Sequence, residues 1–534
     1  MKLCSFDLET WGKDDGYALQ PFRFKTRDAW VTLAGFKYLD PAPAGATNRD
    51  GFHMRRFPSS EWMRQHLRHC ADHNITIVGA NVAYDAAVCI ALGLRDEVMA
   101  CQWLDVLLLY KHSKIMPTFE MTKDTSFSLK AAVREHLPAY ANYEADITFD
   151  PQTVEEWDAL ELYHGIDIDA TGTLTQKFLA DIEPYRMNPI LTEAAAIPLV
   201  ADTYVRGIRA DKDAAIALED KLTRASGGGF VLLKLSDGNV TPEILASPVQ
   251  LRKLIYEDWG LPVTHYTDTK QPSTDREALM YLAVKDPRAK MVAEYREAMN
   301  NRVKFAQGTI NSLEYNGDGF VRPQFKIFGT YSGRGSYSST LFKGKNKIQT
   351  GVALHQWKRD PEYRSLLKPP EGYSLVELDF SMQEIRWLAV LTGDSNLLQI
   401  CQPGEDAHSF MGARIAETDY RQMQEAVVGG DKEAKKYRQL GKLANLSCVL
   451  VGSPVLTDRG YVQIQNVRLT DKLWDGIEWV NHDGVVYQGM KEVIEHDGIK
   501  ATTDHKVLVD GVWVTLDHAR GEQAAIDRAS PPGP

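Results

Sequence analysis

The sequence contains no long apolar run and only six cysteines, which are scattered without a CxxC pair. A membrane-spanning helix needs about 18 or more consecutive apolar residues, and none of the runs approaches that length. The cysteine spacing argues against a cysteine-based zinc site and fits free thiols in a reducing cytosol. The first residues run directly into a strand-like segment and lack the regions of a signal peptide. We therefore expect a cytoplasmic protein with no membrane partner.

The composition is that of an ordinary globular protein, with 44% hydrophobic and 25% charged residues. Its 534 residues correspond to several domains, at roughly 100–200 residues each. The net charge of −11 argues at first sight against nucleic-acid binding. Basic clusters at 343–347 and 432–442 could still contact phosphates, because a basic cleft can lie in an acidic body. Taken alone, each cluster could equally be a solvated face.

Carboxylates in the first 180 residues follow patterns that suit metal binding. Asp7 and Glu9 lie in a strand-like segment, where alternation places them on one face about 6.6 Å apart. Two such carboxylates repel each other, and a bound cation relieves that repulsion. Asp85 follows a second apolar, strand-like run. Tyr163 and Asp167 are spaced as neighbours on a helix.

These ordered patterns, DxE, NxxYD and YxxxD, resemble those of DnaQ-like 3′–5′ proofreading exonucleases over residues 1–180. The resemblance implies an RNase H-like domain with two Mg²⁺ ions about 3.5–4 Å apart, which hold the attacking water and the leaving oxygen of a phosphodiester. It would assign metal binding to Asp7, Glu9, Asp85 and Asp167, and orientation of the attacking water to Tyr163. Each segment alone would more simply be a solvated surface; the ordered set is specific.

Residues 181–447 begin with helical patterns that continue to about residue 315. Within them, the stretches SPVQLRKL at 247–254 and QPSTD at 271–275 resemble the thumb of family A DNA polymerases. The sequences TYSGR at 330–334 and NKIQ at 346–349 follow. They resemble the TxTGR and NLQ block of that family, with Ser for the second Thr and two residues between Asn and Gln. The resemblance implies that Arg334 and Gln349 bind the DNA template–primer. Phosphate contacts of this kind do not depend on base sequence.

The run LVELDFSMQEIR at 375–386 is the strongest signal in the chain. We expect an apolar strand that delivers Asp379 at its end and is followed by a helix. The run resembles motif A of family A polymerases, D-Y-S-x-x-E-x-R, with Phe for Tyr. The resemblance implies that Asp379 holds Mg²⁺ against the incoming triphosphate and that Glu384 disfavours a ribose 2′-OH. It also places His408, in the sequence DAHS, near the nucleotide phosphates.

Arg438 and Lys442 are four residues apart, on one face of an expected helix, and match the R-x-x-x-K of motif B. The resemblance implies that the pair grips the triphosphate and that Lys442 protonates the leaving pyrophosphate. No later segment resembles motif C, which supplies the second catalytic aspartate in the family. With Asp379 alone, we expect the chain to degrade DNA but not to extend a primer with dNTPs.

The helical pattern breaks between Ser447 and Cys448, and short strand-like runs follow. Cys448 and a later T-x-x-H, from Thr502 to His505, resemble the N-terminal half of an intein with the all-β Hint fold. The resemblance implies that the Cys448 thiol attacks the preceding carbonyl and converts the amide to a thioester. It implies that His505 protonates the leaving nitrogen while Thr502 polarises or positions the bond.

The sequence thus predicts a multidomain α/β chain. The preferred hypothesis is an N-terminal polymerase fragment that trans-splices with a separate polypeptide carrying the intein C-half and the missing polymerase part. The split could be natural or a truncation within a longer gene. Alternatives are a standalone exonuclease whose polymerase part only binds DNA, and an assembly module that never splices. The expected domains are the exonuclease at 1–180, a partial polymerase (thumb, palm motif A and start of the fingers) at 181–447, the Hint segment at 448–527 and a disordered tail at 528–534.

Overall fold

The computed structural model describes most of the chain up to residue 444 and shorter stretches beyond it. These residues divide into two compact units, 1–226 with 297–375 and 227–296 with 376–534. No described helix is long and apolar enough to cross a membrane. The described ranges are 1–14, 16–39, 51–114, 127–140, 147–263, 267, 271–283, 285–330, 333–343, 346–393, 395–444, 454–463, 467–468, 471–474, 479–481, 494–496, 499–501, 506–509 and 512–516.

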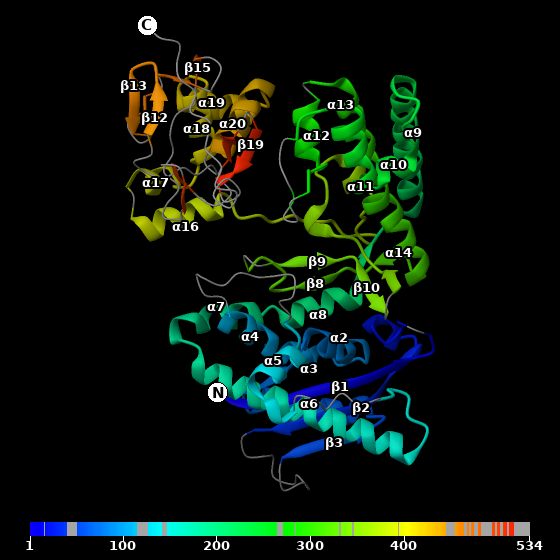
Figure 1. The fold of residues 1–534 in the computed structure, drawn as a ribbon. Coiled ribbons are helices and arrows are strands. Elements are labelled where there is room, and N and C mark those ends of the chain that lie inside the picture. Colours follow the sequence, from blue (N-terminus) through cyan, green and yellow to red (C-terminus); the bar gives the residue numbers. More distant parts are fainter. Residues whose placement is uncertain are drawn as a thin grey trace. The chain divides into compact units, whose positions relative to one another are not determined.

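The first unit is built on a five-stranded sheet with the order β3-β2-β1-β4-β5 (Figure 1). The central strand β1 (Lys2–Gly12) pairs antiparallel with β2 (Ala29–Tyr38) and parallel with β4 (Ile75–Gly79). Strands β3 (Phe52–Arg56) and β5 (Gln102–Asp105) flank them. Every residue of β4 is buried, as is typical of a strand that is covered on both faces. The strands predicted around Asp7 and before Asp85 are confirmed.

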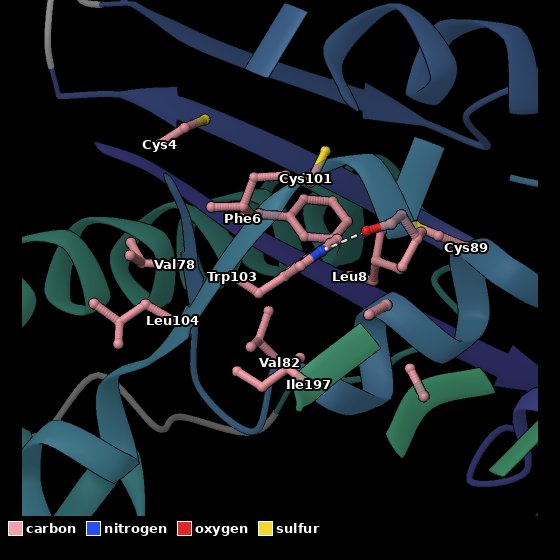
Figure 2. Packing of buried hydrophobic residues seen from close by; sticks show 14 of the residues in the cluster. Cys4, Phe6, Leu8, Val78, Val82, Cys89, Cys101, Trp103, Leu104 and Ile197 are labelled. Carbon is pink, nitrogen blue, oxygen red and sulfur yellow. Dashed lines mark hydrogen bonds between the residues drawn. The ribbon is translucent and has the colours of Figure 1, made fainter. Parts of the chain in front are cut away.

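One face of β1 supplies the apolar core. Cys4, Phe6 and Leu8 alternate along the strand and are buried together (Figure 2). The Phe6 ring stacks on Phe36 at 4.4 Å between centroids and meets Trp103 edge-on at 6.2 Å. Burying one such side chain contributes about 1.5–3 kcal/mol to the free energy of unfolding. This face therefore anchors β1 and leaves the alternate residues to the other face.

The opposite face of β1 and β2 is covered by the long helix α6 (Val154–Asp181). A capping box between Thr153 and Glu156 fixes where this helix begins. Helix and sheet approach closely at two glycines. A Cβ on Gly35 would lie 2.4 Å from Ile168 Cδ1, and one on Gly172 would lie 2.5 Å from Ser5 Oγ. The glycines thus allow α6 to lie directly against the odd-numbered residues of β1.

Shorter elements complete the first unit. Ser128 caps α5 by accepting from the Ala131 backbone N–H. The remaining helices are α1 (Ser60–Asp72), α2 (Ala83–Ala91), α3 (Arg95–Ala100), α4 (Val106–Lys114), α5 (Leu129–His136), α7 (Pro184–Ala194), α8 (Ile197–Arg206), α14 (Gly308–Asn316) and α15 (Pro361–Arg364). The remaining strands are β6 (Ile208–Arg209), β7 (Phe320–Val321), β8 (Gln324–Lys326), β9 (Ser336–Ser338), β10 (Thr340–Lys343) and β11 (Asn346–Gln349).

The helical prediction for the region from residue 199 to about 315 is confirmed. Helix α8 ends at Gly207, whose φ of +70° favours glycine. The last turns of helix α9 (Lys212–Ser236) contribute Leu233 to a small apolar core that also includes Leu251 and Val292. The helices of this core are α10 (Pro242–Ala246), α11 (Pro248–Arg252), α12 (Arg276–Leu282) and α13 (Pro287–Asn301).

The prediction that a strand delivers Asp379 is wrong. Residues 374–380 form no strand pair with any part of the chain that the structure describes. Val376, Leu378 and Phe380 are 79%, 91% and 80% exposed. A strand needs partners for its backbone N–H and C=O groups, and no described strand runs beside this one. The helix expected after it is present as α16 (Gln383–Thr392).

Helices α17 (Ser395–Ile400), α18 (Ala407–Ile415), α19 (Tyr420–Val428) and α20 (Lys432–Ala444) follow. Helices α18 and α20 pack at two glycines. A Cβ on Gly441 would lie 2.4 Å from the His408 carbonyl oxygen, and one on Gly412 would lie 2.8 Å from the Tyr437 carbonyl oxygen. This contact joins the segment with His408 to the expected motif B helix.

From residue 454 the described chain is made largely of short strands, as predicted. Four form a sheet of order β13-β12-β14-β15, and the others form two hairpins. The predicted break at 447–448 and the tail at 528–534 lie outside the described residues. The strands are β12 (Pro454–Thr457), β13 (Gly460–Gln463), β14 (Lys472–Trp474), β15 (Trp479–Asn481), β16 (Ile494–His496), β17 (Ile499–Ala501), β18 (Lys506–Val509) and β19 (Val512–Thr515).

We predict that Gly35→Ala destabilises the sheet by about 1–3 kcal/mol, the usual cost of overpacking. Gly165→Ala is the matched control on α6, because its Cβ would meet only Met54 Cε, at 3.9 Å. A helical Gly→Ala change there should be neutral or stabilising by up to about 1 kcal/mol. Hydrogen exchange of the β1 and β2 amides measures both changes. Equal protection in the two variants would contradict the close approach.

Candidate functional site

Two carboxylates and an imidazole meet between β1 and α6. His164 Nδ1 lies 3.1 Å from Asp7 Oδ2 and 3.3 Å from Glu9 Oε1. One potential ligand atom from each of these three residues lies within 4.8 Å of the other two. The His164 side chain is completely buried and that of Glu9 is 10% exposed, whereas the Asp7 side chain is 26% exposed. The cluster is therefore mostly shielded from water and opens at Asp7.

The local fold explains why these groups meet. Alternation along β1 turns Asp7 and Glu9 toward α6, as the sequence predicts. Gly35 pairs with Asp7 across the sheet, and its missing side chain leaves room for the imidazole. A Cβ there would lie 2.8 Å from His164 Nε2. Nε2 is buried without a hydrogen-bond partner among the described residues, and the polar contacts of the ring with Asp7 and Glu9 are made through Nδ1.

The remaining predicted ligands surround this cluster. Asp85 lies in the first turn of α2 and is 3% exposed, and Asp167 on α6 is 9% exposed. Asp7 and Asp167 both act electrostatically on Glu9, and Asp7 and Glu9 act on Asp85. The structure thus brings the four predicted carboxylates into one electrostatic neighbourhood.

Tyr163 precedes His164 on α6 and lies beside two groups from other segments. Its ring meets Phe149 edge-on at 6.1 Å between centroids, and Lys130 Nζ lies 5.8 Å from the ring centre. Tyr163 and Asp167 lie one helical turn apart, which confirms the predicted helix under the YxxxD pattern.

The buried acids hold their protons unusually tightly. Burial raises the pKa of Glu9 to about 7, and the charges of Asp7 and Asp167 add to the effect while His164 opposes it. Burial, with repulsion from Asp7, raises the pKa of Asp85 well above its ordinary value. Burial alone would lower the pKa of His164, but its hydrogen bonds to Asp7 and Glu9 outweigh this and raise the pKa to about 10. Because ionised carboxylates that are buried close together repel each other, this arrangement favours a bound cation.

The donor set fits divalent cations. Carboxylate oxygens are the ligands that Mg²⁺ and Mn²⁺ take in proteins, and Asp7 and Glu9 offer them here, within electrostatic reach of Asp85 and Asp167. Sequence reasoning missed His164, although it lies between two predicted site residues. Its signal was a histidine three positions before Asp167, a spacing that places two side chains on the same side of a helix.

The predicted nucleotide-binding residues of the second unit are only partly assembled. Arg438 on α20 forms two hydrogen bonds with Asp406, Nε to Oδ2 at 2.6 Å and Nη2 to Oδ1 at 3.4 Å. Asp406 also accepts from the His408 backbone N–H and from Ser409 Oγ. Burial would raise the pKa of Asp406, but Arg438 and Ser409 outweigh it and lower the pKa. Asp379 and Glu384 lie on an exposed segment.

Two further predicted residues form hydrogen bonds with groups close to them in the sequence. Arg334 is exposed after a turn in which its backbone N–H donates to Thr330 Oγ1 at 3.0 Å. Gln349 ends β11 and donates to the Gly351 carbonyl at 2.6 Å. The backbone of Lys442 lies in α20, but its side chain is outside the described part, as are Cys448, Thr502 and His505.

Similarity to known proteins centres on the second of the predicted regions. Residues 238–443 match the family model for DNA polymerase family A. The DNA polymerase of Bacillus phage SP01 is 23% identical over 305 residues, which cover 48% of this chain and 33% of that protein. The DNA polymerase of Escherichia phage T5 is 27% identical over 289 residues, which cover 52% and 32% respectively. The chain spans about a third of the length of these curated relatives.

A solved structure is also similar, the POL domain of Pol1 from M. smegmatis in complex with DNA primer-template and dNTP. The TM-score is 0.58 with 18% identity, over 84% of this chain and 68% of that chain. This identity is low enough that the likeness concerns the fold alone. The range matched by the family model contains Asp379 and Arg438, and it excludes the cluster of Asp7, Glu9 and His164 and the C-terminal strands.

We predict that Asp85→Asn stabilises the protein at pH 8 when divalent cations are absent. The folded-state pKa of Asp85 is raised, so the folded state binds its proton more tightly than the unfolded state. The carboxyl group therefore costs stability increasingly as the pH rises above its unfolded pKa of about 3.9. Below about pH 4 the variant should match the parent protein.

Thermal unfolding with a chelator present, at both pH values, measures this difference. Asp96→Asn is the control, because the Asp96 side chain is 96% exposed. The Asp85 variant should also gain less stability than the parent when Mg²⁺ is added. A destabilised Asp85→Asn protein at pH 8 would contradict the described electrostatics.

Proposed function

Because residues 238–443 match the family model for DNA polymerase family A, we propose that this chain is the N-terminal fragment of a split DNA-directed DNA polymerase. The fragment carries its own metal-dependent 3′–5′ exonuclease and becomes a complete polymerase by protein trans-splicing. Its substrates are then a DNA template–primer and, after splicing, dNTPs. The observation that carries the exonuclease is the group of buried carboxylates around Asp7 and Glu9.

In the exonuclease reaction, Asp7, Glu9, Asp85 and Asp167 hold divalent cations, for which Mg²⁺ is the expected species. Cations bound there would lower the pKa of the attacking water and stabilise the leaving oxygen of the phosphodiester. Tyr163 orients the water from the same turn of α6 that carries Asp167. The partial exposure of Asp7 gives the phosphodiester access to an otherwise buried cluster.

The exposed segment before α16 supports an incomplete polymerase. Three apolar side chains, those of Val376, Leu378 and Phe380, are exposed where motif A is expected to deliver Asp379. Apolar exposure of this extent marks a surface that another segment covers. The proposed partner is a separate polypeptide with the intein C-half and the missing palm strands, including motif C. Glu384, His408, Arg438 and Lys442 would then act on the nucleotide.

Splicing is assigned to the region after residue 447. The short described strands from β12 onward support an all-β segment of the Hint type. In the first step, the Cys448 thiol adds to the Ser447 carbonyl carbon, and the C–N bond breaks as His505 protonates the nitrogen. Thr502 positions the peptide bond between Ser447 and Cys448. A standalone exonuclease is the second candidate, because the metal cluster is built wholly from residues before 168.

We predict that the isolated chain digests single-stranded DNA from the 3′ end when Mg²⁺ is present. Asp7→Ala should reduce the rate about 100-fold or more, the scale of a single preorganised electrostatic contact in an active site. Release of nucleotides from a 3′-labelled strand measures the rate. Asp96→Ala, an exposed carboxylate of the same unit, should digest at the parental rate. Equal rates for Asp7→Ala and the parent would exclude the proposed site.

We predict that primer extension requires splicing. The Asp7→Ala chain should be used, so that digestion does not mask extension. Alone it should add no dNTP, because the second catalytic aspartate is missing. Mixed with a polypeptide that carries an intein C-half followed by motif C, it should lose residues 448–534 and begin to extend primers.

Mass spectrometry of the mixture and gel analysis of the primer report the two events. Cys448→Ala should block both, whereas Cys401→Ala, which changes a buried thiol before the splice point, should block neither. Extension by the unspliced chain would overturn the fragment hypothesis. Full splicing activity in Cys448→Ala would overturn the intein assignment and leave the exonuclease untouched.

A further inference from the structure

We propose that His164 is itself a metal ligand, so that Asp7, Glu9 and His164 form a mixed nitrogen–oxygen centre for a first-row transition cation such as Mn²⁺. The inference rests on the proposed exonuclease site. It adds a ligand and a class of cation that the carboxylate pattern in the sequence does not include.

The two separations from the imidazole to the carboxylates fit one shared cation. His164 Nδ1 is 3.1 Å from Asp7 Oδ2 and 3.3 Å from Glu9 Oε1. Bonds from nitrogen and carboxylate oxygen to such a cation are about 2.0–2.2 Å long. Adjacent donors are then about 3.0 Å apart in an octahedron and about 3.4 Å apart in a tetrahedron, for bonds of about 2.1 Å. Both distances fall in this interval, so these atoms need to move little, and the cation takes the place of the Nδ1 proton that the two carboxylates share.

Packing fixes the imidazole in this orientation. The ring is completely buried in the middle of α6, and its Nε2 side is pressed against Gly35. In the described part of the chain Nε2 has no hydrogen-bond partner, and the polar contacts of the ring with Asp7 and Glu9 are made at Nδ1. A ligating histidine commonly has its second nitrogen held by an outer hydrogen bond. Here steric contact with the sheet holds the ring in place of such a hydrogen bond.

The donor set implies a cation preference. Mg²⁺ favours oxygen ligands and water, whereas imidazole suits the later first-row cations, and carboxylates also suit Mn²⁺. A centre with one imidazole and two carboxylates therefore binds Mn²⁺ in preference to Mg²⁺. Asp85 and Asp167 offer only oxygen donors, so a second cation held mainly by them would remain an Mg²⁺ position. The two cations of the proposed nuclease would then differ in kind.

The test measures Mn²⁺ bound to the full-length chain by pulsed electron paramagnetic resonance, without DNA. We expect a nitrogen modulation from a directly bound imidazole, which changes to the ¹⁵N pattern when the histidines are labelled with ¹⁵N. His164→Gln should abolish the modulation. It should also weaken Mn²⁺ binding by at least the roughly 10–100-fold that loss of an outer-shell partner costs. His66→Gln is the matched control, since His66 is another histidine of the same unit and bonds to the Tyr38 hydroxyl.

Bound Mn²⁺ without nitrogen modulation in the parent chain would overturn the ligand role of His164, even if the chain digests DNA. This measurement needs no variant, so a misfolded His164→Gln protein does not affect it. Retained modulation in a folded His164→Gln protein would also overturn it. The proposed exonuclease fails by a different result, namely parental digestion by Asp7→Ala.

Discussion

Electrostatic repulsion among buried carboxylates is the constraint around which the first unit is organised. Asp7, Glu9, Asp85 and Asp167 lie in an apolar setting where ionisation is costly, as the raised pKa values of Glu9 and Asp85 reflect. An ordinary core would replace such groups with apolar ones. The close approach of α6 to the sheet keeps them together, and the aromatic core on the other face of β1 gives that arrangement a rigid base.

In the second unit, by contrast, a half-buried carboxylate is paired with a basic side chain. Arg438 and Asp406 are paired and hydrogen-bonded, and the carboxylate also caps α18. A paired charge of this kind orders the helices without requiring a ligand. The basic side chain that the resemblance assigns to the triphosphate is therefore already oriented by a protein carboxylate. The carboxylate cluster of the first unit raises the pKa values of its own acids, whereas the pairing with Arg438 lowers the pKa of Asp406.

Much of the first unit could be predicted from the sequence, because its signals are local. Alternation placed Asp7 and Glu9 on one face, and four-residue spacing placed Tyr163 and Asp167 on one helix. The spacing of His164 to Asp167 places it on the same helix side, but its contact with Asp7 and Glu9 depends on Gly35, more than a hundred residues away in the chain. The prediction of a strand at 374–380 failed for a related reason. Its composition favours a strand, but a strand forms only where another segment pairs with it.

Residues 376–380 combine an open backbone edge with three exposed apolar side chains on alternate positions. Such a segment is a template for self-association, because identical copies can pair edge to edge. Glu377 and Asp379 interrupt the apolar residues with like charges, which repel when two copies align. The carboxylate that the resemblance assigns to nucleotide chemistry thus also acts as a gatekeeper against aggregation. Replacing Asp379 with a neutral residue would remove this protection, so a test of its proposed chemistry would also change the solubility of the chain.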